Sequence, residues 1–174
     1  MTAARAHAPA PAAMNLVSRL LPREHVVLGL DATSKKRLFE QIGLLFENSR
    51  QIPRARVFDS FFDREKLGST ALGYGVAIPH GRIKGLKEPV CAFVRTASPI
   101  PFEAPDGEPV SLVFAMLVPE HATEAHLELL SELAQMFSDT DLREALAAAE
   151  DAQAAHRLIT EWSPYAPAQR TAAV

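Results

Sequence analysis

The chain has 174 residues, a formal net charge of −3 and a pI near 6.1, with 48% hydrophobic and 22% charged residues. This composition is ordinary for one globular domain, and the acidic balance gives no electrostatic basis for nucleic acid as the main partner. No apolar run is long enough for a membrane span. The single cysteine, Cys91, excludes a disulfide within the chain and favours a reducing, cytoplasmic location.

Composition also suggests the domain boundaries. Residues 1–13 are rich in alanine and proline and lack the aliphatic centre of a signal peptide, so we expect a disordered tail. Residues 14–163 form the predicted domain, and residues 164–174 form a flexible tail with two prolines. Met14, at the start of the domain, is an alternative to Met1 as the natural start.

The first part of the domain alternates short apolar runs with amphipathic segments. Residues 16–21 predict one helical turn, and residues 25–28 predict a strand that Gly29 ends. Two helices follow, over residues 34–49 and 53–66, with apolar side chains at helical spacing and a glycine stop at Gly68.

Residues 64–82 contain half of the eight glycines of the chain. Glycine permits turns and close approach to a ligand, and Pro79 fixes its own backbone and extends the residue before it. We therefore expect a short strand over residues 76–78 that runs into a rigid turn, with His80 at the mouth of that turn. A Pro-His-Gly sequence alone is more often only a turn. Hydroxyls, an arginine and a histidine close together in the sequence indicate a functional site rather than a turn alone.

The residues around His80 suit phosphoryl transfer. A neutral imidazole has a lone pair on one ring nitrogen that can attack a phosphoryl group. Arg64, in the last turn of the second helix, offers a planar fork of donors for phosphoryl oxygens. Ser69, Thr70 and the backbone N–H groups of the glycine-rich turn, including that of Gly81, are further candidate donors.

The second half contains the most apolar segment of the chain. Residues 110–118 predict a central strand buried on both faces, preceded by a short strand over residues 90–94 and an irregular segment over 98–109. A helix follows from Thr123, with His126 in its first turn, where backbone N–H groups favour an anion. Its predicted apolar face comprises Leu127, Leu130, Leu133, Ala134 and Phe137.

Two shorter helices are expected, capped near Asp139 or Thr140 and near Asp151. The alternation of strands and helices around a doubly buried strand predicts an α/β fold, a three-layer α/β/α sandwich.

Residues 64–70, 73–82 and 125–130 carry a family resemblance. The sequences Arg-Glu-Lys-Leu-Gly-Ser-Thr, Gly-Tyr-Gly-Val-Ala-Ile-Pro-His-Gly-Arg and Ala-His-Leu-Glu-Leu-Leu resemble enzyme IIA proteins of the bacterial phosphotransferase system. The branch is that of the fructose, mannitol and nitrogen-regulatory types, and the nitrogen-regulatory type is the most similar. The resemblance covers about Asn15 to Trp162 and implies a mixed sheet of about five strands flanked by helices.

The same resemblance implies roles for particular residues. His80 matches the phosphorylated histidine, His126 the assisting histidine and Arg64 the arginine that contacts the phosphoryl group. Ser69 and Thr70 match loop residues of the active site. The expected function is a phosphocarrier that accepts a phosphoryl group from an HPr-type protein and regulates other proteins. In some relatives these are potassium transport proteins or sensor kinases. We expect no metal, nucleotide or other cofactor.

Three alternatives remain open from the sequence. A sugar-specific enzyme IIA would pass its phosphate to the IIB domain of a permease. An interaction module would use the same surface without phosphorylation of His80. A metal hydrolase would use His80, His121 and His126, although these histidines lack a metal-binding motif with a matched carboxylate.

Overall fold

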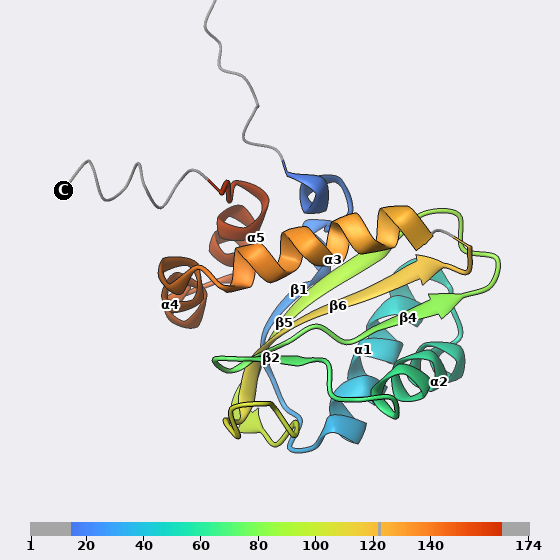
Figure 1. The fold of residues 1–174 in the computed structure, drawn as a ribbon, viewed down its shortest axis with the longest axis horizontal. Helices are drawn as coiled ribbons and strands as arrows, with labels where there is room; N and C mark the ends of the chain where they lie inside the picture. Colours follow the sequence, from blue (N-terminus) through green and yellow to red (C-terminus); the bar gives the residue numbers. More distant parts are fainter. Residues whose placement is uncertain (1–14, 122, 165–174) are drawn as a thin grey trace, which may run out of the picture.

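The computed structural model describes residues 15–121 and 123–164. Residues 1–13 of the predicted N-terminal tail and residues 165–174 of the predicted C-terminal tail lie outside the described part. Figure 1 shows a sheet between two layers of helices, with α1 and α2 on one side and α3, α4 and α5 on the other. The predicted three-layer α/β/α architecture with a mixed sheet is confirmed, and the sheet has six strands.

The first half of the described chain runs through 3-10 helices η3 (Leu16–Arg19) and η4 (Arg23–His25), β1 (Val26–Leu30), α1 (Lys35–Arg50), α2 (Arg54–Glu65), β2 (Ala71–Gly73) and β3 (Val76–Ala77). The second half runs through β4 (His80–Ile83), β5 (Val90–Ile100), β6 (Val110–Pro119), α3 (Thr123–Phe137), α4 (Thr140–Ala148) and α5 (Ala152–Thr160). No helix among the described residues is long and apolar enough to cross a membrane.

Strand β6 is the centre of the sheet. The strand order is β1-β5-β6-β3-β2, and β4 also pairs with β6. β5 is antiparallel to β6, whereas β3 and β4 both run parallel to β6, one after the other along the same edge. β6 therefore positions the two short strands on either side of Pro79.

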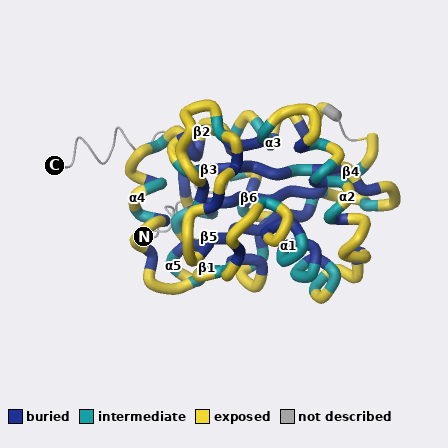
Figure 2. Tube along the Cα trace, turned by 90° about the horizontal axis from the view of Figure 1, so that it is seen from below, coloured by how far each residue is buried: buried dark blue, intermediate teal, exposed yellow. Residues whose placement is uncertain are grey.

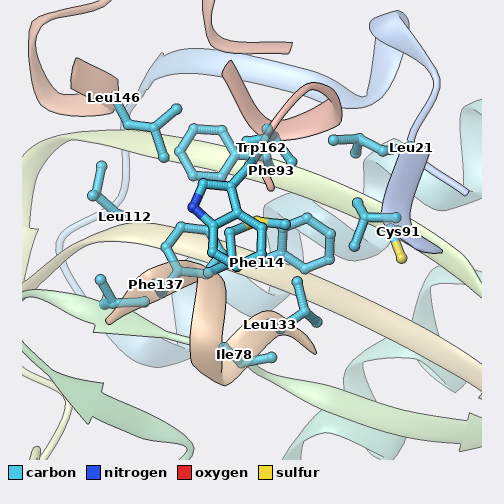
Figure 3. Close-up of a cluster of buried hydrophobic side chains, with 14 of the residues drawn as sticks. Leu21, Ile78, Cys91, Phe93, Leu112, Phe114, Leu133, Phe137, Leu146 and Trp162 are labelled. Atoms are coloured by element: carbon cyan, nitrogen blue, oxygen red, sulfur yellow. The ribbon is translucent and has the colours of Figure 1, made fainter. Parts of the chain in front are cut away.

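The side chains of β6 divide between two hydrophobic clusters, as expected for a strand buried on both faces. One cluster packs against α3, α4 and α5, and Figure 3 shows its aromatic centre. It includes Phe93, Phe114, Phe137 and Trp162. The other packs against α1 and α2 and takes the alternate residues Val113, Ala115 and Leu117 of β6. Figure 2 shows the resulting buried band through the middle of the molecule.

The helices begin where capping residues predict. The Ser34 side chain accepts a hydrogen bond from the Arg37 backbone N–H at the start of α1. Asp139 and Asp151 cap α4 and α5 in the same way. α2 starts directly after Pro53, and the chain leaves it through Gly68 at a φ of +147°. The starts of α1, α4 and α5 follow from local chemistry, because a short polar side chain satisfies N–H groups that have no partner inside the helix.

The strand boundaries require three corrections. Gly29 does not end the first strand but lies inside β1 at a φ of +77°, where the pairing with β5 shifts register. His25, the first residue of the predicted strand, belongs instead to η4 and is buried. β5 continues to Ile100, into the segment predicted to be irregular, because Ile100 pairs with Val110 after a bulge.

Candidate functional site

An interruption in the sheet places His80. β3 ends at Ala77 and β4 begins at His80, so only Ile78 and Pro79 separate two strands that pair with the same neighbour. The predicted rigid turn after residue 78 is therefore wrong, because the chain resumes its extended path along β6. Proline has no N–H for the sheet ladder, which accounts for a break of the strand at this point.

The imidazole of His80 has a defined proton position. Its Nδ1 lies 2.8 Å from the carbonyl oxygen of Ile78, which can only accept, so Nδ1 carries the proton. No described residue binds Nε2, which therefore presents its lone pair. Burial lowers the pKa of His80 below its usual value, and the bond to Ile78 partly offsets this effect. The ring is thus neutral near pH 7, as a nitrogen nucleophile must be.

His126 lies next to His80. The two ring centroids are 5.2 Å apart at an interplanar angle of 71°. His126 is 8% exposed, and its Nε2 is buried with no hydrogen-bond partner among the described residues. Burial lowers the pKa of His126, and the charges of His80, Arg82 and Arg64 lower it further. A buried ring nitrogen without a partner is costly unless a ligand supplies one.

The orientation of α3 differs from the predicted one. Leu127 is 61% exposed, whereas His126, Leu129 and Leu133 are buried. The predicted face is thus rotated, and the histidine itself belongs to the buried stripe.

Arg64 and His80 line one cavity of about 260 Å³. Its other lining residues are Ser69, Thr70, Ala71, Leu72, Ile78, Leu130 and Ala134. Arg64 lies in the last turn of α2, as predicted, and its Nη1 donates to the Gly68 carbonyl over 2.8 Å. The guanidinium retains further donors for an anion, because this bond uses one of several N–H groups.

The two loop hydroxyls are engaged in bonds within the protein. The Ser69 hydroxyl donates to the Phe102 carbonyl over 2.6 Å and accepts from the Ala71 N–H. The Thr70 hydroxyl and backbone N–H both donate to the carboxylate of Glu65. These bonds fix the shape of the loop, and a direct phosphate contact from Ser69 or Thr70 stays a prediction.

Packing against Ser60 requires a glycine at position 81, which the sequence did not reveal. A Cβ atom at this position would lie 2.7 Å from the Ser60 Cβ and 2.9 Å from the Ser60 backbone carbon. Gly81 thus lets β4 lie directly against α2, on the opposite face of the strand from His80. A phosphate contact from its N–H also stays a prediction.

Sequence reasoning missed two residues near the site. Arg82 lies two positions after His80 on β4, so strand alternation puts both side chains on one face. Its Nη1 donates to the Glu120 carbonyl over 2.9 Å, just before α3. Glu65 was also missed, although its spacing from Val57 and Phe61 places a carboxylate on the buried stripe of α2.

The third histidine of the metal alternative does not join this group. His121 is exposed and lies 3.5 Å from Glu120. Among residues 15–121 and 123–164, no group of three or more histidine, cysteine, aspartate or glutamate side chains is arranged to hold a metal ion.

Sequence comparison identifies relatives over most of the chain. The family model of the phosphoenolpyruvate-dependent sugar phosphotransferase system, EIIA 2, matches residues 19–162. A nitrogen regulatory protein of Pseudomonas aeruginosa is 39% identical over 148 residues, which cover 83% of this chain and 95% of that protein. One from Bradyrhizobium diazoefficiens is 40% identical over 144 residues, covering 82% and 94%.

Solved structures give the same grouping. The crystal structure of the nitrogen regulatory protein IIA-Ntr from Neisseria meningitidis is 51% identical, with a TM-score of 0.80, and covers 84% of this chain and 100% of that one. IIA mannitol from Escherichia coli, 22% identical, shares the fold with a TM-score of 0.68 over 79% of this chain and 97% of that one. The chain therefore belongs to the EIIA 2 family of the phosphoenolpyruvate-dependent phosphotransferase system, in the branch that includes the nitrogen regulatory IIA proteins.

Proposed function

We propose that the protein is a phosphocarrier that accepts a phosphoryl group on Nε2 of His80 from the phosphohistidine of an HPr-type protein. The observation that carries this proposal is the bond from His80 Nδ1 to the Ile78 carbonyl, which leaves Nε2 as the nucleophile. Membership of the EIIA 2 family supports the same chemistry.

The transfer needs no group beyond those of the two proteins. The Nε2 lone pair forms the new P–N bond while the P–N bond of the donor histidine breaks, and the donor ring keeps that electron pair. The proton stays on Nδ1, so the phosphorylated ring carries a positive charge that faces the Ile78 carbonyl. Arg64 and His126 would offset the charge on the phosphoryl oxygens, since such transfer depends on positioning and electrostatic stabilisation.

The main role we propose is regulatory, through partner proteins that bind one phosphorylation state. Relatives named nitrogen regulatory protein support this role. A sensor kinase or a potassium transport protein is a candidate partner. The phosphoryl group would change the charge of the surface around His80 and so change which partner binds there.

A sugar-specific role is the second candidate. A fructose-specific EIIA component of Haloferax volcanii is 32% identical over 146 residues, covering 83% of this chain and 95% of that protein. Incubation of the phosphorylated protein with candidate IIB domains separates the two roles. Phosphate that appears on IIB would favour sugar transport.

The central test is labelling of His80. Incubation with phosphoenolpyruvate and the upstream carriers should add one acid-labile phosphate to the protein and none to a His80→Ala variant. His121→Ala is the matched control, because that histidine is exposed and lies outside the site. Equal labelling of the wild type and His80→Ala would refute the assignment of the acceptor.

A further inference from the structure

A fully paired, buried carboxylate lies behind the candidate phosphate loop. Glu65 is the last residue of α2, and its side chain is 4% exposed. Its Oε2 accepts from Lys35 Nζ and from the Thr70 backbone N–H, each over 3.0 Å. Its Oε1 accepts from the Thr70 hydroxyl over 2.8 Å. A buried carboxylate requires such partners, and here Lys35 and Thr70 supply them.

The hydrogen bonds continue from the loop to the imidazole. The Thr70 carbonyl accepts from the Ile78 N–H over 3.0 Å, and the Ile78 carbonyl accepts from His80 Nδ1 over 2.8 Å. An unbroken series of bonds thus links Glu65 to the nitrogen that sets the tautomer of His80. A shift of Thr70 would move the Ile78 peptide, and with it the acceptor that orients the ring.

Lys35 holds this arrangement from the other side. Its side chain is 15% exposed, and its Nζ also lies 3.2 Å from the carboxylate of Glu103. The same Nζ lies 4.7 Å from the centroid of the Phe102 ring, a cation–π contact. The Phe102 carbonyl in turn accepts from the Ser69 hydroxyl. Adjacent residues of the loop are therefore anchored to α2 and to the segment after β5.

We propose that Glu65, held by Lys35, is a positioning residue for His80. It acts through Thr70 and Ile78 to keep the proton on Nδ1 and the lone pair on Nε2. Its negative charge also stabilises the positive ring that forms when Nε2 takes up a phosphoryl group. This inference rests on the proposed role of His80 as acceptor, and it assigns a function to a carboxylate that never touches the phosphoryl group.

The electrostatic surroundings of His80 agree with this role. Burial lowers the pKa of His80 most strongly, and the Ile78 carbonyl raises it. Among the nearby charges, Arg64 lowers the pKa and Glu65 raises it. Removal of the Glu65 charge should therefore lower the pKa of His80 further and disfavour the cationic, phosphorylated ring.

The kinetic test is Glu65→Gln, with Glu103→Gln as the matched control. Each substitution removes one of the two carboxylates that contact Lys35. The Glu103 side chain, however, is 87% exposed, and no hydrogen bond between Glu103 and Thr70 is found among the described residues. We expect phosphoryl acceptance to slow by about 10- to 100-fold in Glu65→Gln, because small displacements of a reacting group cost this much. Acceptance by Glu103→Gln should stay near the wild-type rate. Equal rates in Glu65→Gln and the wild type would overturn the proposal.

A second pair of variants isolates the link through Thr70. Thr70→Val removes the hydroxyl that donates to Glu65, whereas Thr70→Ser keeps it. We expect Thr70→Val to slow acceptance and Thr70→Ser to restore most of the rate. This pair also provides the test if Glu65→Gln does not fold, and equal rates in the two variants would contradict the proposed path.

A structural readout separates positioning from a general loss of stability. Nitrogen-15 NMR of the imidazoles reports which ring nitrogen carries the proton and the pKa of each histidine. In folded Glu65→Gln, the His80 signals should show a mixture of tautomers and a lower pKa, while those of His156 stay unchanged. Wild-type His80 signals in this variant would refute the positioning role. Absence of labelling in the wild type would instead refute the proposed function, and the NMR comparison would still decide the role of Glu65.

Discussion

His25, His80 and His156 differ mainly in what their second ring nitrogen contacts. His25, His80 and His156 each place one ring nitrogen 2.8 Å from a backbone carbonyl, which fixes a proton on that nitrogen. In His25 the other nitrogen lies against the Ser49 hydroxyl, so that ring is held from both sides. The other nitrogen of His80 opens toward the site. A backbone bond thus orients a histidine, and the partner of the opposite nitrogen decides whether the ring can react.

The lowered pKa of His80 predicts the pH dependence of phosphoryl acceptance. Protonation of Nε2 removes the lone pair, and burial holds the pKa below the usual value of 6.5. The rate should therefore stay constant as the pH falls to about 6.5 and decline only as it passes through the lowered pKa. Single-turnover labelling across this range, beside an NMR titration of His80, measures both. A decline centred above pH 6.5 would contradict the lowered pKa.

Protonation of the same rings also affects stability. The pKa values of His25, His80 and His126 are all lowered, chiefly by burial. As the pH falls, the unfolded state therefore binds protons before the folded state does. The contribution of these histidines to the free energy of unfolding is complete above their unfolded pKa values and is lost as the pH falls through their folded pKa values.

At the scale of elements, close contact between β4 and α2 aligns the two ends of the site. β4 begins with His80, and α2 ends one residue after Arg64. Gly81 permits this contact, because any side chain there would meet Ser60. The distance between the acceptor and the guanidinium therefore depends on a residue with no side chain.

Gly81→Ala should destabilise the fold by about 1–3 kcal/mol through overpacking. Gly43→Ala is the matched control, because its Cβ would approach Arg54 O only to 3.1 Å at a helical position that favours alanine. Chemical unfolding of both variants measures the difference. Equal stability of the two would show that β4 and α2 can separate without cost.

Elements were predicted well where their signals are local. Ser34, Asp139 and Asp151 cap helices at the expected positions. The predictions failed at Gly29 and over residues 95–100, where strands continue through bulges. A bulge depends on the partner strand, and the sequence of one strand does not reveal that partner.

The same distinction holds at the candidate site. His80, Arg64 and His126 were proposed from a motif and a family resemblance, and the structure brings them together. The bond from His80 to Ile78 spans two residues, yet it depends on which carbonyls β6 takes, and this is not evident from the local sequence. Glu65 was missed, although its helical spacing from Val57 and Phe61 predicts a buried position. The contact between Lys35 and Glu65 joins residues 30 positions apart, which no local pattern predicts.

In the whole molecule, the two ends of the described chain close on each other. The Asn15 side chain donates to the carbonyls of Ile159 and Trp162 over 2.9 and 3.0 Å. Trp162 is 6% exposed, and its Nε1 donates to Asp139. We therefore propose that the stable domain spans residues 14–163, as the composition predicts.

A chain limited to residues 14–163 should keep the stability of the full chain to within about 0.5 kcal/mol. Asn15→Ala in the full chain should cost about 1–2 kcal/mol, since it removes two hydrogen bonds to backbone carbonyls. Thermal and chemical unfolding measure both. A truncated chain that is less stable than Asn15→Ala would extend the domain into one of the tails.

The break at Pro79 has a meaning beyond topology. Along this edge, β6 bonds to alternate residues: the Leu112 N–H donates to the Gly75 carbonyl and the Met116 N–H donates to the Pro79 carbonyl. Ile78 lies between these two residues and faces the opposite edge, where its N–H donates to Thr70, so its oxygen is left to accept the proton of His80. Two successive carbonyls therefore have separate tasks: that of Pro79 keeps the chain in register on β6, and that of Ile78 sets the tautomer of the imidazole.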